Sequence, residues 1–151
     1  MPETVACSSA FVPPFNQYWV YSDTMTELKL AGSQSTPTIN GDWDEGVLRM
    51  SGDSYPENSF ELFGDIITWV ENYLSNSERP LHLELRLVYM NTSSVRAMLD
   101  IFDLLEAAHQ QGREIRVDWY YDPRNERVVY MADEFKEDCS FPFHIAPDEV
   151  A

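Results

Sequence analysis

Residues 81–102 read "LHLELRLVYMNTSSVRAMLDIF" and contain two patterns joined by a short polar segment. Over Leu81–Tyr89 leucines alternate with polar residues, which is typical of a strand with one buried face. After Asn91–Ser94, apolar residues recur at intervals of three and four and predict an amphipathic helix from about Ser94 to Gln111, ended by Gly112. The apolar positions of this helix are Val95, Met98, Leu99, Phe102 and Leu105. A strand followed directly by a helix is half of a βαβ unit.

Similar elements stand on both sides of this segment. Before it, helical spacing predicts an amphipathic helix that begins at Ser59, is capped by Asn58 or Ser59, and ends in "SNSERP", residues 75–80. Its apolar positions are Phe60, Phe63, Ile66, Ile67, Val70, Tyr73 and Leu74. After it, Glu114–Tyr121 alternates again and predicts a strand. A third helix is predicted from about Asn125 to Glu137, and "SFPFHI", residues 140–145, is either a closing strand or a docked tail.

Residues 36–50 complete the pattern, because two short apolar pieces flank Gly41–Gly46 and predict a hairpin. The chain is therefore an α/β domain with a mixed sheet, in which an N-terminal hairpin precedes parallel strands joined by helices. Right-handed crossovers that add strands in one direction place the helices mainly on one face of the sheet. Polar strand residues then point to the other face: His82, Glu84, Arg86, Arg116 and Asp118.

The composition indicates one acidic domain. The chain has 151 residues and a formal net charge of −16, which argues against a nucleic-acid partner. No apolar run approaches the length of a membrane span, so no membrane partner is expected. The two cysteines, Cys7 and Cys139, favour a reducing cytoplasm over a disulfide scaffold. We expect residues 1–24 to be a poorly ordered N-terminal extension and residues 25–151 to be a single domain.

Three loops are expected at the carboxyl edge of the parallel strands, where sites of such sheets lie. They are residues 52–58, 91–94 and 122–125, and they offer hydroxyls, amides and few acid–base groups. No glycine-rich phosphate loop or nucleophile elbow is present, and the three histidines are spread along the chain. The pattern favours recognition over catalysis and predicts no cofactor and no metal.

Thr92 stands just before the predicted helix of residues 94–111 and has two candidate roles. A threonine at a helix start commonly caps it, because its oxygen accepts a backbone N–H hydrogen bond. The same position suits a phosphate, because helix N-termini carry unpaired N–H groups and the positive end of the dipole. One hydroxyl can serve both roles.

Four motifs resemble a known family. "STPTINGDW" (35–43), "GDSYPENSFELF" (52–63), "YMNTSS" (89–94) and "WYYDPRNERV" (119–128) are similar in order and spacing to the SiaC-type regulatory phosphoproteins of bacterial biofilm control. The resemblance runs from about Leu28 to Ile145. It implies a fold like that of anti-sigma-factor antagonist (STAS-like) domains.

The resemblance also implies a function. Proteins of this kind bind and activate a diguanylate cyclase when unphosphorylated and so raise cyclic di-GMP. A dedicated Ser/Thr protein kinase phosphorylates a threonine that falls on Thr92 here, and a PP2C-type phosphatase reverses this. We expect Thr92 to be the main phosphorylation site, with Ser93 and Ser94 minor, and cyclase release on phosphorylation.

The partner surface is expected to surround Thr92. Arg96, one helical turn beyond Thr92, is placed to pair with its phosphate. The candidate partner-binding residues are Tyr55, Pro56, Glu57, Asn58, Asn91, Arg96 and Asp122. The alternative is a small-molecule-binding or enzymatic α/β domain that uses the same loop edge, with Tyr55, Asp122 and Arg124 as its polar groups.

Overall fold

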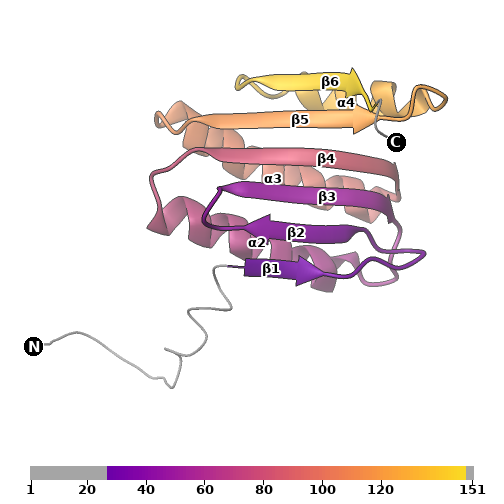
Figure 1. Ribbon diagram of the computed structural model, residues 1–151, viewed down its shortest axis with the longest axis horizontal. Coiled ribbons are helices and arrows are strands. Elements are labelled where there is room, and N and C mark those ends of the chain that lie inside the picture. Colours follow the sequence, from indigo (N-terminus) through magenta and orange to yellow (C-terminus); the bar gives the residue numbers. More distant parts are fainter. Residues whose placement is uncertain (1–26, 149–151) are drawn as a thin grey trace, which may run out of the picture.

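The computed structural model describes residues 27–148, which form one mixed sheet with helices packed on it (Figure 1). The six strands stand in chain order, β1-β2-β3-β4-β5-β6. Their bounds are β1 Glu27–Leu30, β2 Thr38–Asp42, β3 Val47–Ser54, β4 Leu81–Met90, β5 Ile115–Tyr121 and β6 Phe143–Pro147. The helices of the described part are α2 Ser59–Asn76, α3 Thr92–Gln110 and α4 Arg127–Lys136. The predicted extension, residues 1–24, lies outside the described residues.

The strand directions confirm the predicted mixed sheet. β1, β2 and β3 are antiparallel, whereas β3, β4, β5 and β6 are parallel. β4 is central, and its Leu83 pairs with Leu48 of β3 and with Val117 of β5. β6 settles the open alternative for the C-terminal segment in favour of a closing strand. β1 was not predicted, because its four residues are too few to show an alternating pattern.

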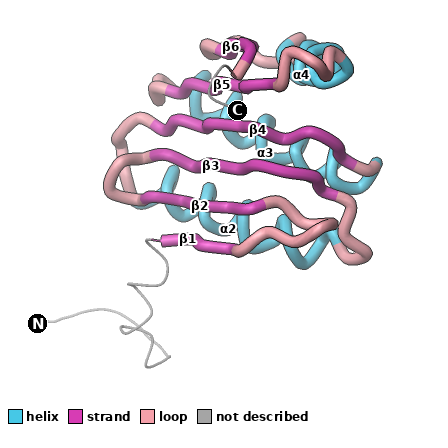
Figure 2. Tube along the Cα trace, turned by 45° about the vertical axis from the view of Figure 1, so that its right-hand side comes forward, coloured by secondary structure: helices cyan, strands magenta, loops and turns pink. Residues whose placement is uncertain are grey.

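The helices of the described part all pack on the same face of the sheet (Figures 1 and 2). This follows from the strand order, because each right-handed crossover from β3 to β6 moves in the same direction. On the opposite face no described helix covers the strands, and polar side chains pair there. Arg49 contacts Glu84 at 3.3 Å, and His82 Nε2 lies 2.6 Å from Asp118 Oδ2. The prediction of helices on one face is therefore confirmed.

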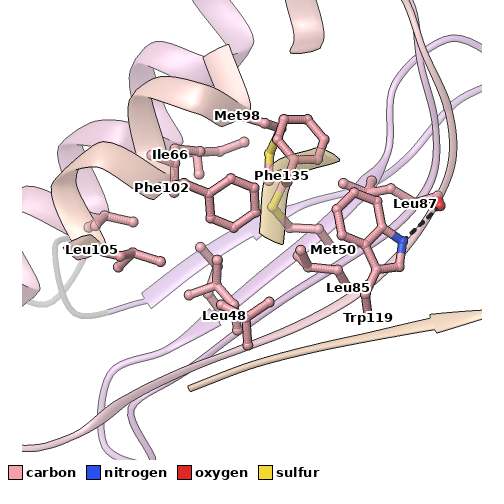
Figure 3. Packing of buried hydrophobic residues seen from close by; sticks show 14 of the residues in the cluster. Leu48, Met50, Ile66, Leu85, Leu87, Met98, Phe102, Leu105, Trp119 and Phe135 are labelled. Carbon is pink, nitrogen blue, oxygen red and sulfur yellow. Dashed lines mark hydrogen bonds between the residues drawn. The ribbon is translucent and has the colours of Figure 1, made fainter. Parts of the chain in front are cut away.

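The core lies between the sheet and this helix layer (Figure 3). Trp119 of β5 is fully buried, its ring stacks on Phe135 of α4 at 5.7 Å, and its Nε1 donates a hydrogen bond to the Leu87 carbonyl at 3.2 Å. Phe143 of β6 completes the stack at 6.4 Å from Trp119. One side chain thus joins β4, β5, β6 and α4.

Two residues of the predicted apolar stripes are exposed. Phe60 of α2 is 91% exposed and Leu99 of α3 is 36% exposed. Phe60 lies about 120° around the helix from the buried Ile66, and Leu99 about 100° from the buried Met98, so each stands at the margin of its stripe. Helical spacing alone does not determine how wide the covered face is.

Glu106 joins α3 to the segment before β6. Its carboxylate accepts hydrogen bonds from the Ser140 backbone N–H at 2.8 Å, from the Ser140 hydroxyl at 2.5 Å and from the Gln110 amide at 2.7 Å. These hydrogen bonds, with the Ser140 backbone N–H contributing most, lower the pKa of Glu106 from 4.5 to about 2. The contact therefore stabilises the fold above about pH 4.5 and is lost as the pH falls toward 2.

We expect Glu106→Gln to weaken the dependence of stability on acid pH. Wild type should lose more of its free energy of unfolding than Glu106→Gln when the pH falls from about 5 to about 3, because only the carboxylate is titrated. Urea unfolding at each pH measures this. Asp103→Asn, at an exposed position of the same helix, is the matched control and should follow wild type. Equal pH slopes for wild type and Glu106→Gln would contradict the role of the contact.

Candidate phosphorylation and partner-binding edge

The loop after β3 and the start of α3 are joined at the carboxyl edge of the sheet. The Asn91 N–H donates to the Ser54 carbonyl at 2.9 Å. The buried hydroxyls of Ser54 and Ser94 lie 2.8 Å apart, and those of Ser59 and Ser93 lie 2.7 Å apart. These bonds hold the starts of α2 and α3 together. Two of the three predicted loops therefore form one connected surface.

Asn91, not Thr92, caps α3. Its side-chain oxygen accepts the Ser94 N–H at 2.9 Å, and its carbonyl accepts the Val95 N–H at 3.0 Å. The prediction that Thr92 caps this helix is therefore wrong, because Asn91, one residue earlier, is the cap. The Thr92 hydroxyl is exposed and makes no hydrogen bond with any residue of 27–148. A group added to this hydroxyl leaves the cap intact.

The helix start retains capacity to interact with an anion. The N–H groups of Thr92 and Ser93 find no hydrogen-bond acceptor within residues 27–148. Such first-turn N–H groups, with the positive end of the helix dipole, favour a nearby negative charge. Arg96, in the next turn, is exposed and has no ion-pair partner in the described part of the chain. The surroundings of Thr92 are therefore locally favourable to a phosphate.

The predicted loop of residues 55–58 lies beside this helix start, as expected. Tyr55 packs edge-on against Tyr89, with ring centroids 5.9 Å apart, and Tyr89 immediately precedes Met90 and Asn91. Tyr55 and Tyr89 are both exposed, so their rings form an exposed aromatic pair at this edge. Val88, the residue before Tyr89, is also exposed and borders the hollow near Asp122. Asn58 caps α2 by accepting the Glu61 N–H at 3.1 Å, whereas Glu57 is exposed. Pro56 lines a shallow hollow next to Pro37.

Asp122 lies at the same edge, but two strands away from Tyr55. It follows β5, while Tyr55 follows β3, and β4 stands between them at a spacing of about 5 Å per strand. Its carboxylate binds the Arg124 guanidinium at 2.7 Å, and this hydrogen bonding lowers the pKa of Asp122 to about 2. Asp122 borders a hollow of about 270 Å³ with Arg86 and Tyr120. Within residues 27–148, no hydrogen bond or ion pair joins Asp122 to residues 91–94.

The described residues hold little that suits acid–base or metal chemistry. No group of three or more metal-ligating side chains occurs in residues 27–148. His82 is bound to Asp118 on the open sheet face. Burial, with nearby carboxylates adding to it, raises the pKa of the Cys139 thiol to about 12, so it is a poor nucleophile at neutral pH. Within the same residues, no helix has the length and apolar character needed to cross a membrane.

Sequence patterns missed one feature of this edge. Phe60 was assigned to the buried stripe of α2, yet it projects from the first turn beside a groove between α2 and α3. The groove has a volume of about 340 Å³, and Ser93 and Arg96 also border it. The sequence holds no signal for this placement, because Phe60 fits the apolar spacing of the buried stripe as well as its buried neighbours do.

Comparisons with known proteins found a family model, a relative and solved structures that are similar to this chain. The family model described as "SiaC family regulatory phosphoprotein" matches residues 30–148. An uncharacterized protein of Pseudomonas aeruginosa strain UCBPP-PA14 is 62% identical over 126 residues, which are 83% of this chain and 100% of that protein.

Two crystal structures from Pseudomonas aeruginosa are also similar. The crystal structure of apo-SiaC is 60% identical in sequence and superposes with a TM-score of 0.77. The match covers 80% of this chain and 98% of the apo-SiaC chain. The second is the crystal structure of the diguanylate cyclase SiaD in complex with its activator SiaC. The matched chain is 61% identical, with a TM-score of 0.79, and the match covers 80% of this chain and 99% of the matched chain.

Proposed function

Because this chain belongs to the SiaC family of regulatory phosphoproteins, we propose that it is a non-enzymatic phospho-switch. The unphosphorylated protein binds and activates a diguanylate cyclase in the cytoplasm, and so promotes cyclic di-GMP signalling and biofilm formation. A dedicated Ser/Thr protein kinase phosphorylates Thr92 and releases the cyclase, and a PP2C-type phosphatase restores the binding form. The observation that carries the proposal is the exposed, unbonded Thr92 hydroxyl at the start of α3.

The relatives support the partner. SiaC of Pseudomonas aeruginosa is described as the activator of the cyclase SiaD, and it is 61% identical to this chain over nearly its whole length. At this identity the surfaces around the carboxyl edge are expected to be alike. The exposed aromatic pair of Tyr55 and Tyr89, at the end of the strand that leads into Thr92, is of the kind that partner surfaces use.

Among the three hydroxyls of the segment, Thr92 suits a kinase best. The Ser94 hydroxyl is fully buried and bonded to Ser54. The Ser93 hydroxyl is bonded to Ser59 at 2.7 Å and to the Asn91 side chain at 3.2 Å. Phosphate transfer to either serine requires breaking these contacts, whereas the Thr92 hydroxyl is free to enter a kinase site. We therefore assign the main site to Thr92, with Ser93 as the minor site and Ser94 disfavoured.

Arg96 is proposed as the internal counter-charge of the phosphate. It stands four residues after Thr92, which places both side chains on one side of the helix about one turn apart. Because its guanidinium has no ion-pair partner in residues 27–148, pairing with a phosphate breaks no existing bond. Asn91, Tyr55 and the start of α2 then form the rim of the modified surface.

We expect Thr92→Ala to lose nearly all phosphate incorporation when the protein is incubated with ATP and its cognate kinase. The reason is that only this hydroxyl of the segment is exposed and unbonded. Intact-mass and peptide mass spectrometry measure the incorporation. Ser93→Ala is the matched control and should be labelled close to the wild-type level. Strong labelling of Thr92→Ala would refute the assignment of the site.

A further inference from the structure

Four serine side chains meet where α2 and α3 begin, and their hydroxyls form two pairs. The two helices lie side by side on the sheet (Figures 1 and 2). The inner pair joins Ser54 at the end of β3 to Ser94 of α3 at 2.8 Å, and both residues are fully buried. The outer pair joins Ser59, the first residue of α2, to Ser93 of α3 at 2.7 Å. A contact of 3.5 Å between Ser59 and Ser94 links the pairs, and it is longer than an ordinary O–H···O hydrogen bond.

Exposure separates Ser94 from Thr92 as a phosphate acceptor, but it does not separate Ser93. The Ser94 hydroxyl is fully buried, so burial alone withholds it from a kinase. Ser93 is an exposed residue, as Thr92 is, and the Cα atoms of these neighbours are about 3.8 Å apart. What distinguishes the two is hydrogen bonding. The Thr92 hydroxyl makes no hydrogen bond within residues 27–148, whereas the Ser93 hydroxyl is bonded at both its oxygen and its proton.

The number of protons fixes the direction of these bonds. The Ser93 hydroxyl donates its proton to the Asn91 side-chain oxygen at 3.2 Å. A hydroxyl has one proton, so in the outer pair Ser59 donates and Ser93 accepts. The shorter of the two bonds therefore engages a lone pair of the Ser93 oxygen and turns this oxygen toward α2. An acceptor oxygen needs a free lone pair directed at the phosphoryl group, so Ser59 holds Ser93 in a form unsuited to phosphate transfer.

The helix itself does not need the Ser59 hydroxyl. Asn58 caps α2, and alanine forms helices better than serine does. Within residues 27–148 the Ser59 hydroxyl contacts only the hydroxyls of Ser93 and Ser94. A purely structural role, in which the outer pair only fastens α2 to α3, predicts a loss of stability when this hydroxyl is removed. It predicts no change in which residue is phosphorylated.

We propose that Ser59 is a specificity-determining residue that restricts phosphorylation to Thr92 by holding the hydroxyl of Ser93 against α2. The kinase reaction rests on the function proposed above, whereas the role of Ser59 rests on the hydroxyl geometry. In the reaction the acceptor oxygen bonds to the γ-phosphorus of ATP, the bond from that phosphorus to ADP breaks, and the hydroxyl proton passes to a base of the kinase. The Thr92 hydroxyl is free to do this in the folded protein. Ser93 becomes a second acceptor once the Ser59 hydroxyl is removed.

Substitutions at Ser59 should therefore create a new phosphorylation site. In a Thr92→Ala background, Ser59→Ala should raise phosphate incorporation at Ser93 at least about 5-fold, which corresponds to about 1 kcal/mol, the usual net contribution of one hydrogen bond. Ser59→Cys nearly keeps the side-chain size but donates weakly, so it should give a similar gain. Ser59→Thr keeps the hydroxyl and should stay at the low level of Thr92→Ala alone. The probe is ATP with the cognate kinase, and peptide mass spectrometry assigns the phosphorylated residue.

Ser54→Ala is the matched control, because it breaks the inner pair and leaves the outer pair in place. In the Thr92→Ala background it should lower the melting temperature, since the buried Ser94 hydroxyl loses its partner, but it should add no label at Ser93 or Ser94. A double-mutant cycle in urea tests the outer pair without a kinase. The summed losses in unfolding midpoint of Ser59→Ala and Ser93→Ala should exceed the loss of the double variant.

The outcomes are distinct. If the kinase does not phosphorylate wild type within residues 92–94, the proposed function fails, and the cycle in urea alone decides whether the outer pair exists. If wild type is phosphorylated on Thr92 but neither Ser59→Ala nor Ser59→Cys adds label at Ser93, the function stands and the role of Ser59 is wrong. An equal gain from Ser54→Ala would also overturn it, because general loosening of the α3 start would then explain the new site. Additive midpoint losses in the cycle would do the same.

Discussion

Phosphorylation of Thr92 is expected to weaken cyclase binding by at least about 100-fold, which corresponds to about 2.7 kcal/mol. A phosphate adds between one and two negative charges at neutral pH, and these charges must be desolvated or paired if the surface is buried in a complex. Arg96 offsets only one of them. The chain already carries a formal charge of −16, so the added charge is further repelled by any acidic surface of the partner.

Calorimetric titration of the cyclase with three forms of the protein tests this effect. Unmodified wild type and Thr92→Ala should bind tightly, whereas protein phosphorylated by its kinase should not. Thr92→Asp is a weaker mimic and should lie between these limits, because a carboxylate carries less charge and fewer oxygens than a phosphate. Treating the phosphorylated sample with a PP2C-type phosphatase should restore binding. Tight binding by the phosphorylated form alone would reverse the sign of the switch.

Trp119→Ala is expected to have the largest effect on stability, a loss of about 3–5 kcal/mol of unfolding free energy. The residue is fully buried, stacks on Phe135 and Phe143, and donates a hydrogen bond to the Leu87 carbonyl. Its removal leaves a cavity beside Phe135 and takes away the indole N–H that the Leu87 carbonyl accepts (Figure 3). A small domain is stable by only about 5–15 kcal/mol, so this variant should be close to its folding limit.

Urea unfolding of a short series separates the contributions. Trp119→Phe keeps an aromatic ring but removes the indole N–H, and it should lose less than half as much stability as Trp119→Ala. Tyr130→Ala on the exposed side of α4 should stay within about 0.5 kcal/mol of wild type. A wild-type midpoint for Trp119→Ala would show that the stack does not hold the C-terminal part of the sheet.

The central elements could be predicted because their patterns are long and regular. β4 alternates over Leu81–Tyr89, and its flanking helices show spacings of three and four, so element type, strand direction and the covered face all follow. β1 could not be predicted, since Glu27–Leu30 gains its order from pairing with β2 rather than from its own sequence. The likeness to anti-sigma-factor antagonist domains stays a prediction.

The candidate site was only partly visible in the sequence. Loop position predicted that Tyr55 and Thr92 would be neighbours, because both follow parallel strands at one edge. The exposure of Phe60 depends on how wide the covered face of α2 is, and helical periodicity does not contain that information. The choice of Asn91 over Thr92 as the cap depends on backbone geometry at the strand–helix junction, where either residue type is a suitable cap.

The cap formed by Asn91 has a consequence for the lifetime of the protein. Because the first turn of α3 is secured by Asn91 and Ser94, esterification of Thr92 removes no contact on which the fold depends. On the function proposed above, the phosphorylated form should therefore open no more readily than the unmodified form, because Arg96 and the helix dipole can only add to its stability. Cellular proteases act on opened chains, so phosphorylation is not expected to shorten the lifetime of the protein, and a cell can change the phosphorylated fraction without depleting its stock.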